Sequence, residues 1–145
     1  MKRMLSSICI LLLGVFLLAG CSGNYAPKQE DFDFSVTPMT QVKAEYVQGE
    51  EIAYSVKLIR KSGGRFQFQD SSTLCCVSFE PVGIEPYFAR NADVVTHRIG
   101  RNYTYEDTYT IRTARCEPGQ YLFAVRFYMN QLEYNFDQEI TIAAA

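Results

Sequence analysis

Cysteine and histidine are the side chains with the strongest chemistry in this chain of 145 residues, which holds five of the first and one of the second. Cys75, Cys76 and Cys116 lie in its folded part, and outside the cytoplasm they could form one disulfide. Adjacent strand residues point to opposite faces, so only one of Cys75 and Cys76 can face Cys116. The sequence therefore predicts a disulfide between Cys116 and either Cys75 or Cys76, with three reduced thiols as the alternative.

The single imidazole, His97, limits both metal binding and catalysis. A closed zinc site takes four ligands, and a Ser-His-Asp or Cys-His arrangement would depend on this one residue. The sequence around Ser71, Ser72 and Cys116 does not resemble a strained nucleophile turn of the G-x-S-x-G type. We expect His97 to be an exposed structural residue, and we expect no catalytic residues, no metal and no cofactor.

Aromatic side chains are frequent, with ten Tyr, ten Phe and no Trp. Most alternate with polar residues and should be core, but a few fall outside this alternation within the irregular segment 80–102. The sequence predicts a recognition patch there, made of Tyr87, Phe88, Arg90, Arg98 and Arg101. A loop and edge strand that only close one end of the domain are the alternative for this segment.

Asp107 is an unusual carboxylate, because it shares a predicted strand face with Tyr105 and Tyr109. We expect it at the margin of the core or in contact with a hydroxyl group.

The N-terminus has the three parts of a secretory signal. Lys2 and Arg3 precede an apolar run over residues 8–19, which is short for a membrane-spanning helix. The following Leu18-Ala19-Gly20-Cys21 resembles the lipobox of bacterial lipoproteins, which implies a lipid on Cys21 and anchoring in a membrane. A retained membrane anchor is the alternative.

This pattern divides the chain into a signal peptide (1–20), a lipidated cysteine with a flexible tether (21–30) and one folded domain (31–145). Ser22, in place of an aspartate, resembles lipoproteins of the bacterial outer membrane. The domain would face either the periplasm or the cell surface.

The folded part alternates apolar and polar residues with a period of two, which indicates strands. Turn residues such as Gly49, Gly63-Gly64, Pro118-Gly119 and Asn130 separate the runs. About seven short strands without a helical stripe predict a single antiparallel β-sandwich of immunoglobulin type, with an up-and-down barrel as the alternative. Gly119-Gln120-Tyr121 resembles the tyrosine corner of such sandwiches.

The charge pattern argues against direct binding of nucleic acid. Removal of Lys2 and Arg3 takes the formal net charge from −2 to −4, and no basic run remains.

Several segments together resemble the TraQ-type lipoproteins encoded with conjugative transposons. They are Asp31-Phe32-Asp33-Phe34-Ser35-Val36, Gly49-Glu50-Glu51-Ile52, Arg60-Lys61-Ser62-Gly63 and the tyrosine-bearing strand from Tyr103 to near Cys116. The segment 75–101 departs from that pattern. The resemblance implies a non-catalytic accessory lipoprotein that holds envelope or conjugation-apparatus proteins near the membrane.

A carbohydrate- or ligand-binding surface lipoprotein is the alternative function, and the absence of Trp counts mildly against sugar binding.

Overall fold

The computed structural model describes residues 24–145. The predicted signal peptide, the Leu18–Cys21 motif and the lipid on Cys21 lie outside the described residues. Two short 3-10 helices, η1 (Gln29–Asp31) and η2 (Thr113–Arg115), accompany nine strands. The strands are β1 (Phe32–Pro38), β2 (Tyr46–Val47), β3 (Glu51–Arg60), β4 (Phe66–Asp70), β5 (Cys75–Pro81), β6 (Val95–Ile99), β7 (Thr104–Arg112), β8 (Gly119–Met129) and β9 (Leu132–Ala143). Within residues 24–145, no helix is long and apolar enough to cross a bilayer.

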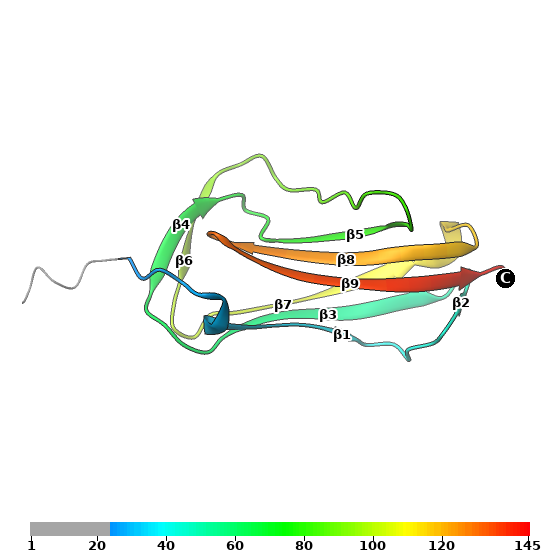
Figure 1. Cartoon of the computed structure of the whole chain (residues 1–145), viewed down its shortest axis with the longest axis horizontal. Helices are drawn as coiled ribbons and strands as arrows, with labels where there is room; N and C mark the ends of the chain where they lie inside the picture. Colours follow the sequence, from blue (N-terminus) through cyan, green and yellow to red (C-terminus); the bar gives the residue numbers. More distant parts are fainter. Residues whose placement is uncertain (1–23) are drawn as a thin grey trace, which may run out of the picture.

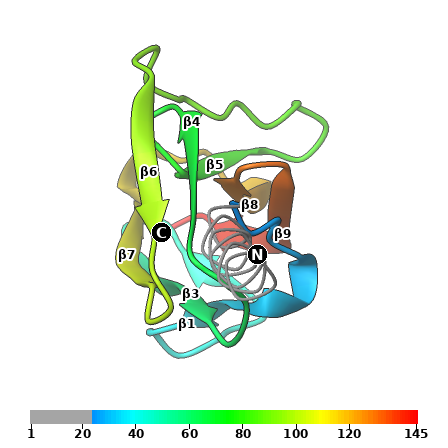
Figure 2. The same ribbon diagram turned by 90° about the vertical axis from the view of Figure 1, so that its left-hand side faces the viewer.

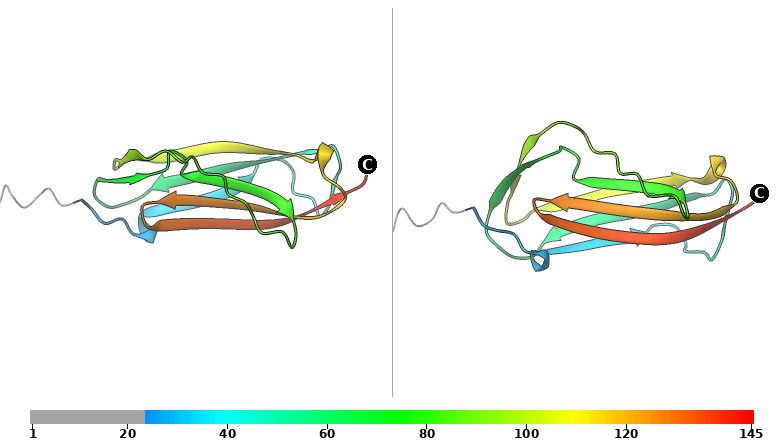
Figure 3. Two further views of the ribbon diagram at one scale, coloured as in Figure 1. Left: turned by 90° about the horizontal axis from the view of Figure 1, so that it is seen from above. Right: turned by 45° about the horizontal axis from the view of Figure 1, so that its top comes forward.

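Two main sheets pack face to face (Figures 1 and 3). One has the strand order β1-β3-β7 and is antiparallel, and the other has the order β2-β9-β8-β5 and is antiparallel except where β2 joins β9. The pair β4-β6 forms a third small sheet across one end of the sandwich (Figure 2). The prediction of an all-β antiparallel sandwich is confirmed.

The core comes from the alternation that the sequence shows. Ile52, Tyr54, Val56 and Leu58 on β3 are fully buried, and they face an equally buried row on β8. Tyr54 stacks on Phe123 with the ring centroids 4.4 Å apart, which joins the two sheets at their centre. Burial of such rings supplies most of the stabilisation of a small sandwich.

Two predicted turn features are present. Asn130 has a φ of 58° in the two-residue connection between β8 and β9, a left-handed conformation that Asn tolerates well. The hydroxyl of Tyr121 donates a 2.9 Å hydrogen bond to the carbonyl oxygen of Glu117, which is the geometry of a tyrosine corner.

The segment before β1 is held by a buried acid. The Asp31 carboxylate accepts hydrogen bonds from the hydroxyls of Tyr25 and Ser62 (both 2.7 Å) and from the backbone N–H of Lys28 (2.9 Å). These hydrogen bonds, chiefly the one from Ser62, hold the pKa of Asp31 below its usual value. The chain is therefore held against the domain from Tyr25 onward, over the part of the predicted tether that the structure describes; residues 21–23 of that tether lie outside the described residues.

A buried arginine, Arg60, closes the same end of the molecule. Its guanidinium donates to the carbonyl oxygens of Ile99 (3.2 Å) and Gly100 (2.9 Å) and also to that of Gly64. The loop after β3 and the turn after β6 are thus tied to one side chain. The small β4-β6 sheet is fixed to the sandwich through these contacts.

Candidate functional site

A pocket of about 420 Å³ opens at the side of the sandwich, where β5 and β7 are the edge strands of their sheets. We call it the tyrosine pocket. The residues lining it come from the loop before β5 and its first residue, from β6, and from β7 with the residue before it: Ser72, Thr73, Leu74, Cys75, His97, Tyr103, Tyr105, Asp107 and Tyr109. Because successive strand residues alternate in direction, Tyr105, Asp107 and Tyr109 on β7 share the face that lines this pocket.

Hydroxyl groups and a carboxylate converge in the pocket. The hydroxyls of Tyr105 and Tyr109 lie 3.1 Å apart, and the Tyr105 hydroxyl is 3.3 Å from Oδ2 of Asp107. The backbone N–H of Thr108 donates a 2.8 Å hydrogen bond to the other oxygen of Asp107. Of the two positions predicted for Asp107, contact with a hydroxyl group is the one observed, and the residue itself is exposed.

Burial extends the pH range over which the two phenols stay neutral. Loss of contact with water raises the pKa of Tyr105 and that of Tyr109 well above the ordinary value for tyrosine. Asp107 makes no ion pair within the described part of the chain. The pocket thus offers neutral aromatic walls, hydroxyl groups and an unpaired acidic side chain.

The pocket also holds the Cys75 thiol and the His97 ring, a pair that nucleophilic catalysis could use. Burial raises the pKa of Cys75, whereas a reactive cysteine needs a lowered one. The ring of His97 stacks on Phe68 with centroids 5.0 Å apart, and its Nε2 lies 2.8 Å from the carbonyl oxygen of Ser71. His97 is half-buried and packed rather than exposed, which corrects the prediction.

The predicted disulfide is not formed, and Cys75, Cys76 and Cys116 are all free. Cys75 pairs with Phe127 near one end of β8, whereas Cys116 precedes Gly119 at the other end. The strand between those ends spans about 26 Å, far beyond the ~7 Å Cα separation that a disulfide bridges. Cys76 points to the outer face, where its thiol lies 3.4 Å from the carbonyl oxygen of Ala89.

The predicted recognition patch divides into two parts. Tyr87, Phe88 and Arg90 lie in the long connection between β5 and β6, which runs along the outer face of the β5-β8 pair (Figure 1). The guanidinium of Arg126 sits 5.1 Å from the ring of Phe88, and Arg90 pairs with Asp70 at 2.9 Å. These contacts hold the connection on the sheet, and Tyr87 remains exposed.

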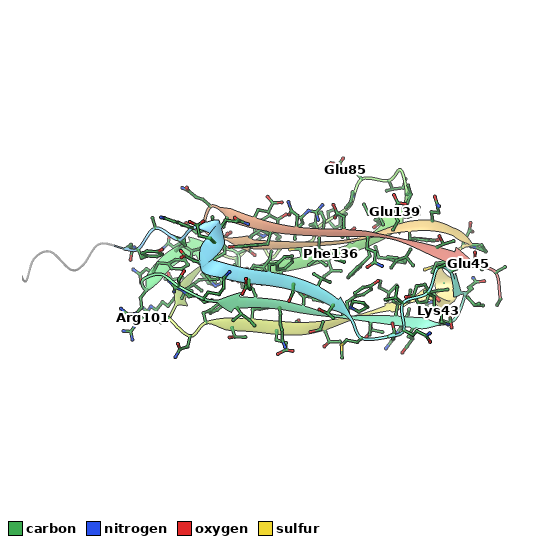
Figure 4. The ribbon with its side chains drawn as sticks, turned by 60° about the horizontal axis from the view of Figure 1, so that its bottom comes forward. Lys43, Glu45, Glu85, Arg101, Phe136 and Glu139 are labelled. Carbon is green, nitrogen blue, oxygen red and sulfur yellow. The ribbon has the colours of Figure 1, made fainter. Side chains whose placement is uncertain are left out.

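Arg98 and Arg101 belong to the other part, at the end of the molecule crossed by β4 and β6. Arg98 is on β6 and Arg101 follows in the turn to β7 (Figure 4). The structure does not bring these two arginines into one surface with Tyr87 and Phe88.

Sequence reasoning assigned Tyr103, Tyr105 and Tyr109 to the core and missed the pocket that they line. An acidic residue between two tyrosines of the same strand face was the signal that could have found it. Among residues 24–145, no three His, Cys, Asp or Glu side chains gather in a way that would hold a metal ion.

Comparison with known proteins yields no family model and no curated protein that matches this chain. Solved structures with a similar strand arrangement include β-glucosidase from Listeria innocua. Its complex with gluconolactone has 11% identity and a TM-score of 0.44 over 77% of this chain, and its complex with isofagomine has 13% identity and a TM-score of 0.45 over 79%. This chain covers 16% of the length of either of those structures.

Proposed function

We propose that this protein is a lipid-anchored module of the bacterial envelope that binds a partner protein without catalysis. The observation that carries the binding role is the tyrosine pocket. It is a concave site with aromatic walls and a few convergent polar groups, the usual make-up of a binding site. The lipobox-like motif at Leu18–Cys21 supports the membrane anchor.

The chemistry of the pocket suits a basic side chain. Asp107 supplies an unpaired negative charge, the hydroxyls of Tyr105 and Tyr109 can accept hydrogen bonds, and aromatic rings attract cations. A lysine or arginine of the partner would satisfy all three features. The pocket is open at the side of the sandwich, so a projecting side chain could enter without separation of the sheets.

Titration with small model compounds tests whether the tyrosine pocket binds a basic side chain. Nuclear magnetic resonance would follow the pocket residues as blocked lysine and blocked arginine are added, with blocked glutamine as the uncharged probe. We expect shifts at Tyr105 and Tyr109 with the charged compounds alone. The Asp107→Asn variant should lose this response, whereas Glu106→Gln on the opposite strand face should keep it, because Glu106 pairs with Lys57 outside the pocket.

Equal shifts with charged and uncharged probes, or an unchanged response in Asp107→Asn, would contradict the basic occupant. Glucose and N-acetylglucosamine serve as further probes in the same titration. Saturable shifts with these sugars alone would support the ligand-binding alternative, since tyrosine hydroxyls and a carboxylate also suit sugar hydroxyls.

The resemblance to TraQ-type lipoproteins extends the proposal to conjugative DNA transfer. In this role the protein would hold components of the transfer apparatus near the outer membrane. A clean deletion should lower transfer frequency, and complementation with the wild-type chain should restore it where Asp107→Asn does not. Normal transfer in the deletion strain would remove the conjugation role and leave the binding role to be judged by the titration.

A further inference from the structure

The described chain begins at the end of the sandwich that β4 and β6 cross, and the C-terminus lies at the opposite end (Figure 1). Asn24 itself lines a second pocket there, of about 350 Å³. Arg65 and Arg98 also line it, and buried Phe66 and Ile99 are among its apolar residues. We call this the arginine pocket.

The start of the chain is fixed beside the arginine pocket. The ring of Tyr25 packs so closely over Gly63 and Gly64 that a Cβ atom at Gly63 would lie 2.5 Å from it. The hydrogen bond from Tyr25 to Asp31 adds a second attachment. Two residues lie between Cys21 and Asn24, and the three Cα–Cα steps that join them span at most about 11 Å.

Unpaired positive charge gathers at this end. Arg65, Arg98 and Arg101 are exposed and make no ion pair among the described residues, whereas Arg90, Arg112 and Arg126 each pair with a carboxylate. The nearby Lys61 is neutralised by Asp33 at 2.7 Å, and Asp31 is buried. Guanidinium groups bind phosphate oxygens in a bidentate manner, which suits them to anionic lipid headgroups.

We propose that the β4-β6 end of the sandwich faces the membrane and that Arg65 and Arg98 bind the phosphate groups of anionic lipids there. The inference rests on the lipid anchor at Cys21 proposed above, which places the bilayer within about 11 Å of Asn24. The domain then stands upright on the bilayer, and the loops near Lys43 and Glu45 point away from it (Figure 4). Arg101, in the turn beside the pocket, adds to the attraction.

Hydrogen exchange of the lipidated protein in vesicles tests the orientation. The protein would be reconstituted in phosphatidylcholine alone and in phosphatidylcholine with phosphatidylglycerol. We expect slower exchange over 64–68 and 97–101 in the anionic vesicles only. In the double variant Arg65→Glu/Arg98→Glu, we expect the slowing of exchange by anionic vesicles to be reduced roughly tenfold or more. Arg115→Glu, which removes an exposed arginine without an ion pair from η2 at the other end, should keep it.

Equal exchange in both kinds of vesicle, or protection that persists in the double variant, would overturn the proposal. Loss of protection on addition of inorganic phosphate at constant ionic strength would also overturn it in favour of a small-anion site. Intact mass of the same sample reports the lipid on Cys21 separately. An unmodified Cys21 would contradict the proposed lipid anchor. Flotation of that unmodified protein with anionic vesicles would still measure whether Arg65 and Arg98 bind lipid.

Discussion

The hydroxyl of Tyr25 donates a 2.7 Å hydrogen bond to the buried carboxylate of Asp31, six residues later in the chain. This contact joins the segment next to the predicted membrane anchor to the first strand of the sandwich. The proposed anchor at Cys21 would therefore lie close to the domain, and the arginine pocket at that end would lie near the bilayer surface.

The Asp31 carboxylate should make stability depend on pH. Its folded-state pKa is lowered, so its contribution is present above the unfolded value of about 3.9 and is lost as the pH falls through the folded value. Asp31→Asn should cost about 1.5–3 kcal/mol at neutral pH, because charge-assisted hydrogen bonds are weakened. Urea unfolding from about pH 6 to about pH 3 would check this. A gap between wild type and variant that stays constant over this range would argue against the role of the charge.

The tyrosine corner should contribute measurably to stability. Tyr121→Phe removes the hydrogen bond to Glu117 and keeps the ring, so we expect a loss of about 1 kcal/mol in the free energy of unfolding. Tyr128→Phe is the matched control, because no hydrogen bond of the Tyr128 hydroxyl is found among residues 24–145. Equal losses in both variants would show that the corner adds nothing specific.

The stacked pair at the centre of the sandwich should dominate core stability. Phe123→Ala would leave a cavity beside Tyr54 and should cost about 3–5 kcal/mol. Tyr87→Ala removes an exposed ring, 74% accessible, and should change stability by about 0.5 kcal/mol or less. Chemical unfolding monitored by circular dichroism would measure the free energy of unfolding of both variants. Similar losses of stability in the two would contradict the placement of Phe123 in the core.

The alternation of residues was enough to predict the sandwich, its main strands and the inward faces of β3 and β8. It was also enough to predict the contact of Asp107 with a hydroxyl, whereas the tyrosine corner was predicted from the resemblance of Gly119-Gln120-Tyr121 to that motif. These features depend on local period and turn chemistry, which neighbouring residues determine. The position of Cys116 relative to Cys75 depends on the length and direction of β8, so spacing alone gave the wrong pairing.

The tyrosine pocket was missed for a related reason. Tyr105 and Tyr109 have the pattern of core residues, but β7 is an edge strand that faces another edge, β5, across the gap between the sheets. The order of strands in a sheet is a property of the whole chain. The fixed segment near Tyr25 was missed as well, because its partners Gly63 and Gly64 lie far along the sequence.

The three free thiols should differ in reactivity. Burial raises the pKa of all three thiols, so the difference should come from access: half-buried Cys116 should react with iodoacetamide in the native state, whereas Cys75 and Cys76 are buried and should not. Mass spectrometry of peptides after alkylation, with and without urea, would measure this order. Isolation of a peptide that joins Cys116 to Cys75 or Cys76 from unreduced protein would refute the free-thiol arrangement.

The central claim is that a lipid on Cys21 holds this sandwich at a bacterial membrane. Intact-mass analysis of protein extracted from the membrane fraction tests it most directly. The account predicts a chain that begins at Cys21 and carries the added mass of acyl chains. A chain that retains residues 1–20 and has no lipid at Cys21 would contradict it.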